Sequence, residues 1–225
     1  DAAINPGNSG GAPGLAEVHV IAIPDGEARV QALLTGQIDM NRYVPFAQKK
    51  IFDGNSKFNV SVVPTGNWRG MVMRTDTAPF DNPKVRKAVR MAVDRQELVD
   101  LVMGGAATVS CDTPVAPSDQ YRLDMDCSQD INGAKKLLSE AGYPNGIEMT
   151  IHVSTKEPTW PTIAEVMQQQ LAKAGIKADI QMTPSKSYWK ETWMKKAVAM
   201  TRWNERPADS ALHEIYHSGA KWNES

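Results

Sequence analysis

This sequence has little net charge, no long apolar run and only two cysteines, and each shortage narrows the classes of protein to which it can belong. A formal net charge of −1 over 225 residues leaves no excess of positive charge, so we expect no nucleic-acid partner and no binding to an anionic membrane surface. A membrane-spanning helix needs roughly 18 or more consecutive apolar residues, and the sequence has no such run. The chain opens on Asp1 without a signal peptide, which predicts a processed form or an excised piece of a longer protein.

Arrangements typical of catalysis are also scarce. We find no glycine loop that would cradle a phosphate, no nucleophile beside a base, and no carboxylates spaced for acid–base work. The sequence therefore predicts a protein that is not an enzyme and uses no cofactor. Two short motifs run against this expectation.

The first motif lies among residues 1–14, a stretch rich in Gly, Asn and Pro. It reads INPGNSGG and resembles the nucleophile loop of trypsin-like bacterial heat-shock proteases, in which the serine at the position of Ser9 attacks the substrate. Such a serine needs a histidine base and an orienting carboxylate, and in that family both precede it. No histidine precedes Ser9, so we interpret residues 1–14 as a leader or linker, of either native or non-native origin.

The second motif is His213-Glu214-Ile215-Tyr216-His217, which matches H-E-x-x-H. On a helix, two histidines spaced by four residues can bind one zinc ion while the glutamate acts as general base, so a zinc metallopeptidase is the alternative function. Zinc needs a third protein ligand, however, and Glu224 is the only acidic side chain that follows. We favour an exposed helix carrying two histidines, with no metal bound.

The most regular stretch runs from Phe80 to Met103. Asn82 followed by Pro83 predicts a helix start, Asp94 predicts a second start, and Gly104 predicts the end. Apolar residues recur there with the helical period; they are Val85, Ala88, Val89, Ala92, Val93, Leu98, Leu101 and Val102.

Periodicity predicts the other elements in the same way. A strand–turn–helix–strand pattern covers residues 15–40, and two strands follow within residues 57–74. Later elements are a helix after Asp130, a strand at 147–153, a helix at 161–174, a strand at 176–182, a helix at 187–195 and a strand at 197–203. The strand–helix–strand run from 147 to 182 predicts parallel strands.

Three stretches resemble one family closely; they read RTDTAPFDNPKVRKAVRMAVDRQELVDLVMGG, INGAKKLLSEAGYPNGIEMTI and IPDGEARVQALLTGQIDM. The family is the peptide/nickel-type (oligopeptide- and dipeptide-binding, cluster C) solute-binding proteins of bacterial ABC transporters, and the resemblance runs from about Leu15 to the chain end. It implies an α/β fold of the type II periplasmic-binding-protein kind, with a mixed sheet and flanking helices. Residues 15–66 would be the last segment of the first lobe, and residues 67–225 the second ligand-binding lobe.

The resemblance also implies where solute binds. In the family a strand ends in a tryptophan, and an acidic residue three positions on pairs with the amino terminus of a bound peptide. Trp203 matches the tryptophan, either as a stacking platform or as core, but Arg206 stands at the acidic position. Its guanidinium would suit a carboxylate or phosphate, or Arg206 is a solvated loop charge, or Glu205 or Asp209 substitutes for the acid. Asn204 belongs to the same predicted ligand-binding loop.

Two aromatic residues complete the predicted ligand-binding set. Tyr43 lies in residues 41–44, which by resemblance form a loop near the cleft. Trp68 follows the crossing between lobes near Gly66, where it would line the cleft mouth or be buried beside a hinge.

The resemblance implies a protein that captures a peptide-like solute in the periplasm or outside the cell and delivers it to the membrane subunits of an ABC permease, as a monomer and without catalysis. A chain holding only part of the cleft would bind weakly. In an exported protein, Cys111 and Cys127, sixteen residues apart within a polar loop at 106–129, could close a disulfide worth roughly 3 kcal/mol. Two free thiols are the alternative.

Overall fold

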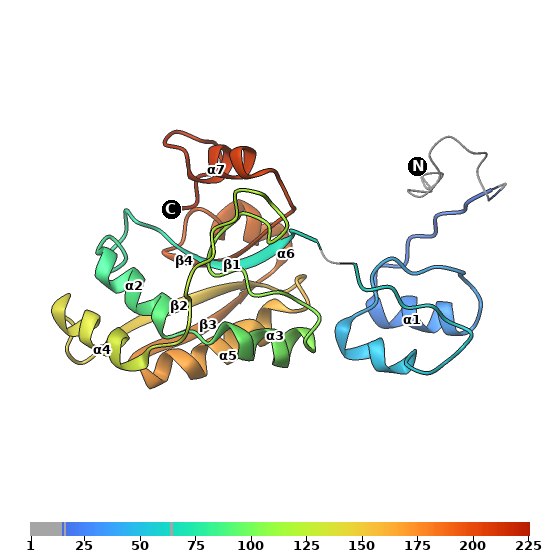
Figure 1. Ribbon diagram of the computed structural model, residues 1–225, viewed down its shortest axis with the longest axis horizontal. Coiled ribbons are helices and arrows are strands. Elements are labelled where there is room, and N and C mark those ends of the chain that lie inside the picture. The colour runs from blue at the N-terminus through green and yellow to red at the C-terminus, as the bar shows by residue number, and fades with distance from the viewer. Residues whose placement is uncertain (1–14, 16, 64) are drawn as a thin grey trace. The chain divides into compact units, whose positions relative to one another are not determined.

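The computed structural model describes residue 15 and residues 17–63 and 65–225, and its chain forms two compact units, Asp1–Val60 and Ser61–Ser225 (Figure 1). The motif around Ser9 lies outside the described residues. The assignment of residues 15–66 and 67–225 to two lobes stays a prediction. In the described part of the chain, no helix is both long and apolar enough to cross a membrane.

The first unit is built around one helix, α1 (Gly26–Leu34). The Asp25 side chain caps it by accepting a hydrogen bond from the Ala28 N–H at 2.8 Å, as expected for an aspartate at this position. A 3₁₀ turn, η1 (Phe46–Ile51), follows, and the ring of Phe52 meets the edge of Phe58 with centroids 5.2 Å apart.

The strands predicted within residues 15–63 are wrong. The described residues of the first unit contain no strand, and apolar side chains that would alternate between faces, such as Val18 and Val20, are exposed. A strand is stabilised by hydrogen bonds to a neighbouring strand, and these residues pair with none. Alternating apolar and polar residues therefore favour a strand only where a neighbouring strand is available to pair with it.

The second unit is organised on a four-stranded mixed sheet, which confirms the predicted α/β class. Its strands are β1 (Trp68–Met73), β2 (Ile147–Ser154), β3 (Ile176–Thr183) and β4 (Val198–Trp203), in the order β1-β4-β2-β3. β2 runs parallel to β3 and to β4, as the strand–helix–strand pattern predicts, while β1 is antiparallel to β4. The edges of the sheet are therefore β1 and β3.

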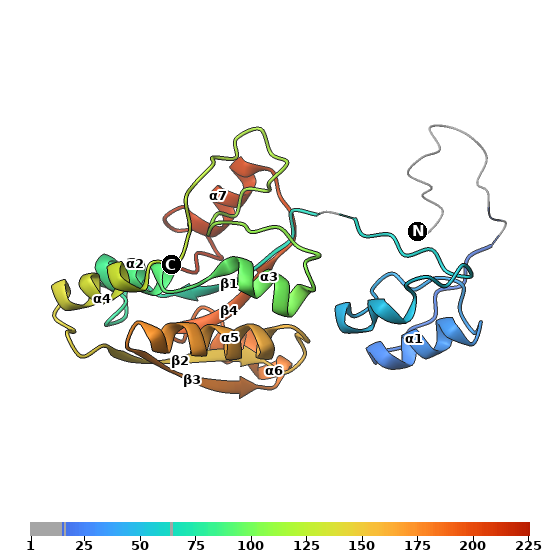
Figure 2. The same cartoon turned by 60° about the horizontal axis from the view of Figure 1, so that its bottom comes forward.

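The longer helices of the second unit are α2 (Pro83–Met91), α3 (Arg95–Met103), α4 (Ile131–Glu140), α5 (Trp160–Lys173) and α7 (Ala208–Tyr216). Asn82, Asp94 and Asp130 cap α2, α3 and α4 by accepting backbone N–H groups at 2.7–3.0 Å, which confirms the predicted helix starts. Figures 1 and 2 place α3 and α5 on one side of the sheet, with α7 and the C-terminal end on the other.

The core lies where α2, α4 and α5 pack on the sheet. The predicted apolar face of α2 is buried, with Val85 and Ala88 fully inaccessible. The prediction that Leu101 continues this apolar face is wrong, because α3 has no buried residue and Leu101 is 62% exposed. Helical periodicity predicts which residues share a face of a helix, but it does not show where that face stops being covered by other elements.

The helix predicted at 187–195 is also shorter and differently wound. A single turn, α6 (Ser185–Ser187), leads into a π-helical turn, η2 (Tyr188–Thr192). Tyr188 is fully buried, and its hydroxyl donates to the carbonyl oxygens of His152 and Met200. Burial, together with the charge of Glu224, raises the pKa of Tyr188. This turn therefore ties β2 to β4 through one side chain.

Candidate functional site

The site begins at the last residue of β4, Trp203. The register of the antiparallel pair sets Trp203 directly opposite Trp68, the first residue of β1, so two of the predicted ligand-binding residues are neighbours. Residues directly opposite in such a pair have side chains on the same face of the sheet. Trp68 and Trp203 are both half-buried, and Asn204, the next residue, is exposed.

The loop after β4 is fastened to the segment that enters β1. The Glu205 carboxylate accepts the Gly66 N–H at 2.9 Å, and the Glu205 N–H donates to the Asn67 side-chain oxygen at 2.7 Å. A Cβ on Gly66 would meet the Glu205 side chain at 2.6 Å, so only glycine leaves room for this approach. Glu205 is therefore held by the Gly66 backbone and the Asn67 side chain of its own unit.

Arg206 is held by two neighbours within the second unit. Its guanidinium lies over the Trp203 ring, 5.6 Å from the centroid, a cation–π contact. It also pairs with Glu214 on α7, with Arg206 Nη1 2.8 Å from Glu214 Oε2. The two side chains are 32% and 30% exposed. Asp209, in the first turn of α7, is exposed and available to solvent.

A buried carboxylate, Glu224, lies behind Trp203. Glu224 is 1% exposed, and its two oxygens accept the indole N–H groups of Trp193, at 2.7 Å, and of Trp203. Burial raises the pKa of Glu224, while the hydrogen bonds it accepts act in the opposite direction.

Aromatic rings extend this arrangement in a continuous row. Edge or tilted contacts with centroids 5.3–6.3 Å apart connect them in the order Trp160, Tyr188, Trp189, Trp193, Trp203 and Trp222. Such edge-on pairs are favourable beyond the area they bury. The row runs from the buried core at Trp160 to the half-buried Trp203, so the orientation of Trp203 is set by packed neighbours on more than one side.

A hollow of about 410 Å³ opens beside Glu224. Arg86 and Lys87 from α2, Met73 from β1 and Tyr216 from α7 are among its lining residues. Burial raises the pKa of Tyr216 to about 12, with smaller contributions from the charges of Glu224 and Asp112.

The H-E-x-x-H sequence does not form the helical zinc motif. α7 ends at Tyr216, and His217 follows with extended backbone angles, φ −65° and ψ 137°. Glu214, which would be the general base, is paired with Arg206. No group of three or more His, Cys, Asp or Glu side chains placed to hold a metal occurs among the described residues.

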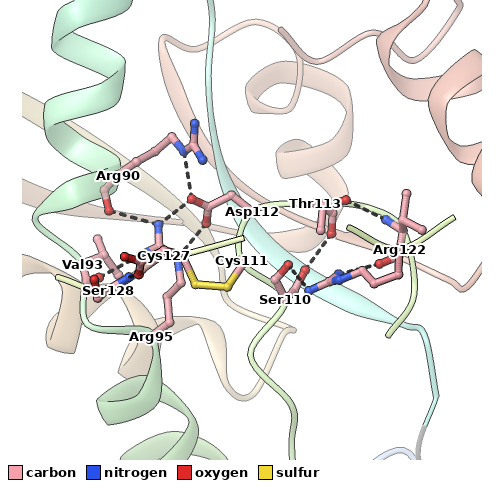
Figure 3. The surroundings of a disulfide bond; sticks show 12 residues. Arg90, Val93, Arg95, Ser110, Cys111, Asp112, Thr113, Arg122, Cys127 and Ser128 are labelled. Carbon is pink, nitrogen blue, oxygen red and sulfur yellow. Dashed lines mark hydrogen bonds and ion pairs between the residues drawn. A yellow bond between two sulfur atoms is a disulfide. The ribbon is translucent and has the colours of Figure 1, made fainter. Parts of the chain in front are cut away.

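The loop between α3 and α4 is closed by a disulfide. Cys111 and Cys127 are bonded, with Cα atoms 5.3 Å apart, and Asp112 beside them accepts hydrogen bonds from Arg90 Nε at 2.8 Å and Arg95 Nε at 2.9 Å (Figure 3). Arg95 also donates to the Cys127 carbonyl at 2.9 Å. The two arginines thus fasten the disulfide to the junction of α2 and α3.

The same loop reaches the site. Asp119 accepts the Ala208 N–H at 3.1 Å and so supplies a cap to α7 from outside the helix. Ala116 is buried, and its Cβ lies 2.7 Å from where a Cβ on Gly66 would be. The loop closed by the disulfide therefore contacts the start of α7, just after Arg206, and Gly66, the residue whose N–H donates to Glu205.

Asp112→Asn is expected to lower the free energy of unfolding of the second unit by about 2 kcal/mol at pH 7, since hydrogen bonds to charged groups contribute about 1.5–3 kcal/mol. Burial alone would raise the pKa of Asp112, but the hydrogen bonds and charges of Arg95 and Arg90 outweigh it, and the pKa lies below its ordinary value. The stabilisation is therefore present above the unfolded-state pKa and is lost as pH falls through the folded-state pKa. Urea unfolding at pH 7 and at about pH 3 measures this.

The matched control is Asp124→Asn, which removes an exposed carboxylate from the same loop. It should change stability by less than about 0.5 kcal/mol. A gap between Asp112→Asn and the parent that stays constant from pH 7 to about pH 3 would contradict the assignment.

Tyr43, the remaining predicted ligand-binding residue, belongs to the first unit. It is 65% exposed, its N–H donates to the Asn41 side chain, and the Arg42 guanidinium lies 5.0 Å from its ring centroid. The second unit by itself therefore brings together Trp68, Trp203, Asn204 and Arg206, with Asp209 on the adjoining helix. A role in binding stays a prediction for each of these residues.

Sequence reasoning missed Glu224, Trp193 and Trp222 as parts of the site. In the sequence, Glu224 stands out only as a third zinc ligand for the H-E-x-x-H motif. The signal that could have drawn attention to the C-terminal residues is compositional: three of the six tryptophans lie within residues 193–222, close to Arg206 and Glu224 in a chain that is only 7% aromatic.

Comparison with known proteins identifies similar chains. The sequence profile described as bacterial extracellular solute-binding proteins, family 5 middle, matches residues 5–223. The chain is 34% identical over 172 residues to the glutathione-binding protein GsiB of Escherichia coli strain K12, a match that covers 75% of this chain and 33% of that protein. The chain thus spans about a third of the length of the curated relatives it matches.

Solved structures share the fold. The ABC transporter-associated periplasmic binding protein DppA from Helicobacter pylori, in complex with the peptide STSA, matches with a TM-score of 0.73 and 26% identity over 86% of this chain and 38% of that chain. The periplasmic binding protein AgaA from A. tumefaciens R10, in complex with agropinic acid, matches with a TM-score of 0.75 and 26% identity over 89% of this chain and 42% of that chain. The predicted type II periplasmic-binding-protein fold is confirmed.

Proposed function

Because the chain belongs to the family 5 bacterial extracellular solute-binding proteins, we propose that it takes part in capturing a peptide-like solute for an ABC importer. The family resemblance read from the sequence is confirmed by the profile match over residues 5–223. Two relatives are named for glutathione or solved with a bound peptide, which supports a peptide-like solute. No catalytic step is part of the proposal.

The observation that carries the proposal is the pairing of Trp203 and Arg206 at the end of β4. A half-buried indole offers a flat apolar surface, and a guanidinium offers a planar fork that matches a carboxylate. A peptide or glutathione presents an apolar part for the indole and a carboxylate for the guanidinium. In this proposal Trp203 packs against the solute, Arg206 binds its carboxylate in competition with Glu214, and Asn204, Asp209 and Trp68 supply further contacts.

The proposal includes a location and partners. The Cys111–Cys127 disulfide supports an oxidising compartment, the periplasm or the exterior of the cell. There the protein acts as a monomer that hands its solute to the membrane subunits of an ABC permease, and it associates with the membrane through that transporter.

Trp203→Ala is expected to weaken solute binding at least tenfold, because truncating a central aromatic residue costs more than about 1.4 kcal/mol at binding sites. The measurement is an NMR titration with glutathione, dialanine and trialanine, each with a free and with an amidated carboxyl terminus. The free carboxylates should bind the parent more tightly than the amides if Arg206 reads that group.

The control variant is Leu212→Ala, which truncates a 48% exposed residue on α7 and should leave affinity unchanged. Equal binding by Trp203→Ala and the parent would refute the role of Trp203. Failure of every probe to bind the parent would overturn the proposed function.

A further inference from the structure

Glu224 is a buried carboxylate that no salt bridge neutralises among the described residues. Burying an ionisable group is costly unless it is hydrogen-bonded, and a leucine of similar size would avoid that cost. What Glu224 gains instead is two indole donors, from Trp193 and Trp203. Glu224 therefore fixes the positions of two indole N–H groups, which an apolar side chain of the same size could not do.

The geometry leaves the indole of Trp203 one orientation. An indole has a single hydrogen-bond donor, and for Trp203 that donor is spent on Glu224. The ring edges meet Trp193 and Trp222 with centroids 6.3 and 5.9 Å away. Turning the ring over would break the hydrogen bond and leave both a buried acceptor and a donor without a partner.

The same ring carries Arg206 on its face. The guanidinium lies 5.6 Å from the Trp203 centroid, so the plane of the indole also sets where the cation stands. A rotation of the ring would move the platform and displace the guanidinium from the ring. The hydrogen bond to Glu224 therefore helps to place both groups proposed to contact solute, together with the aromatic neighbours of Trp203 and the pairing of Arg206 with Glu214.

We propose that Glu224 is a positioning residue for solute binding, which fixes the plane of the Trp203 ring by accepting its indole N–H. The inference rests on the proposed function, because it assumes that Trp203 and Arg206 contact the solute. Glu224 itself is buried and touches the solute only through them. The bond to Trp193 anchors the second carboxylate oxygen, which keeps the acceptor from rotating.

The test follows the indole protons directly. The chain is labelled with ¹⁵N-tryptophan, which gives an indole signal for each of its six tryptophans, and Trp193→Phe and Trp203→Phe assign two of them. In Glu224→Gln we expect both assigned signals to shift. We expect affinity for the best binder among glutathione, dialanine and trialanine to fall roughly tenfold. Glu191→Gln removes a 61% exposed carboxylate two residues from Trp193 and should change neither signal nor affinity.

A double-mutant comparison separates positioning from general stability. In the Trp203→Phe background the indole donor is absent, so adding Glu224→Gln should cost no further affinity. Glu224→Asp keeps the carboxyl group but shortens the side chain by one methylene, and it should shift at least one indole signal even if Glu224→Gln does not fold. Circular dichroism reports folding of each variant.

Three results would overturn the inference: unshifted indole signals in both Glu224 variants, shifted signals with affinity within about twofold of the parent, or a further tenfold loss in the Trp203→Phe background. Failure of the proposed function has a different signature. In that case no probe binds the parent, while the indole signals of the Glu224 variants still shift.

Discussion

Replacing Gly146 by alanine is expected to lower the free energy of unfolding of the second unit by more than about 3 kcal/mol, because strain and a steric clash add at one position. Gly146 has φ +86°, a conformation that favours glycine. An added Cβ would lie only 1.8 Å from the Gly175 carbonyl oxygen. These two glycines precede Ile147 and Ile176, the first paired residues of β2 and β3, so relieving the clash requires the two parallel strands to separate.

Gly142→Ala is the matched control for this prediction. Gly142 has φ +94° in the turn after α4, yet a Cβ there would have no atom within 4 Å. Its substitution should therefore cost only the backbone strain, on the order of 1 kcal/mol. Chemical unfolding followed by circular dichroism compares the two variants, and losses equal within error would show that the clash is relieved without cost.

Removing the disulfide with Cys111→Ser and Cys127→Ser together is expected to destabilise the second unit by about 3 kcal/mol, the value for closing a loop of this length in the unfolded chain. The loop it closes carries Asp112, which the two arginines bind, and Asp119, which caps α7. The variant should therefore also expose the Ala208 N–H to faster hydrogen exchange.

The control for the disulfide is the parent protein under reducing conditions. The reduced parent and the double variant lack the same covalent link and should unfold at the same urea concentration. A double variant as stable as the oxidised parent would mean that the ion pairs around Asp112 hold the loop without the covalent bond.

Much of the second unit could be predicted from the sequence, because its elements are specified locally. Asn82, Asp94 and Asp130 each precede an apolar helical pattern and each accept the expected backbone N–H. The parallel pairing of β2 with β3 follows from the helix between them. Each of these signals lies at the start of its helix or within a single strand–helix–strand run.

The parts that could not be predicted depend on residues far apart in the sequence. Trp193, Trp203 and Glu224 meet because β4 and the C-terminal residues fold back on one another, and no spacing rule connects an acceptor to indoles 21 and 31 residues away. The strands expected before residue 64 failed for the related reason that a strand requires a partner. The sequence predicts Arg206 as a ligand-binding residue. Its ion pair with Glu214 depends on how α7 folds back toward the loop after β4, which composition does not show.

The register that sets Trp68 opposite Trp203 has a consequence for how the protein folds. β1 opens the second unit and β4 comes near its end, so the ladder between them cannot form until almost the whole unit has been synthesised. Contacts between residues so distant in sequence slow folding, because a large loop must close before they form. The pair of tryptophans should therefore be among the last contacts made, and the surface proposed to bind solute would be complete only after that pairing.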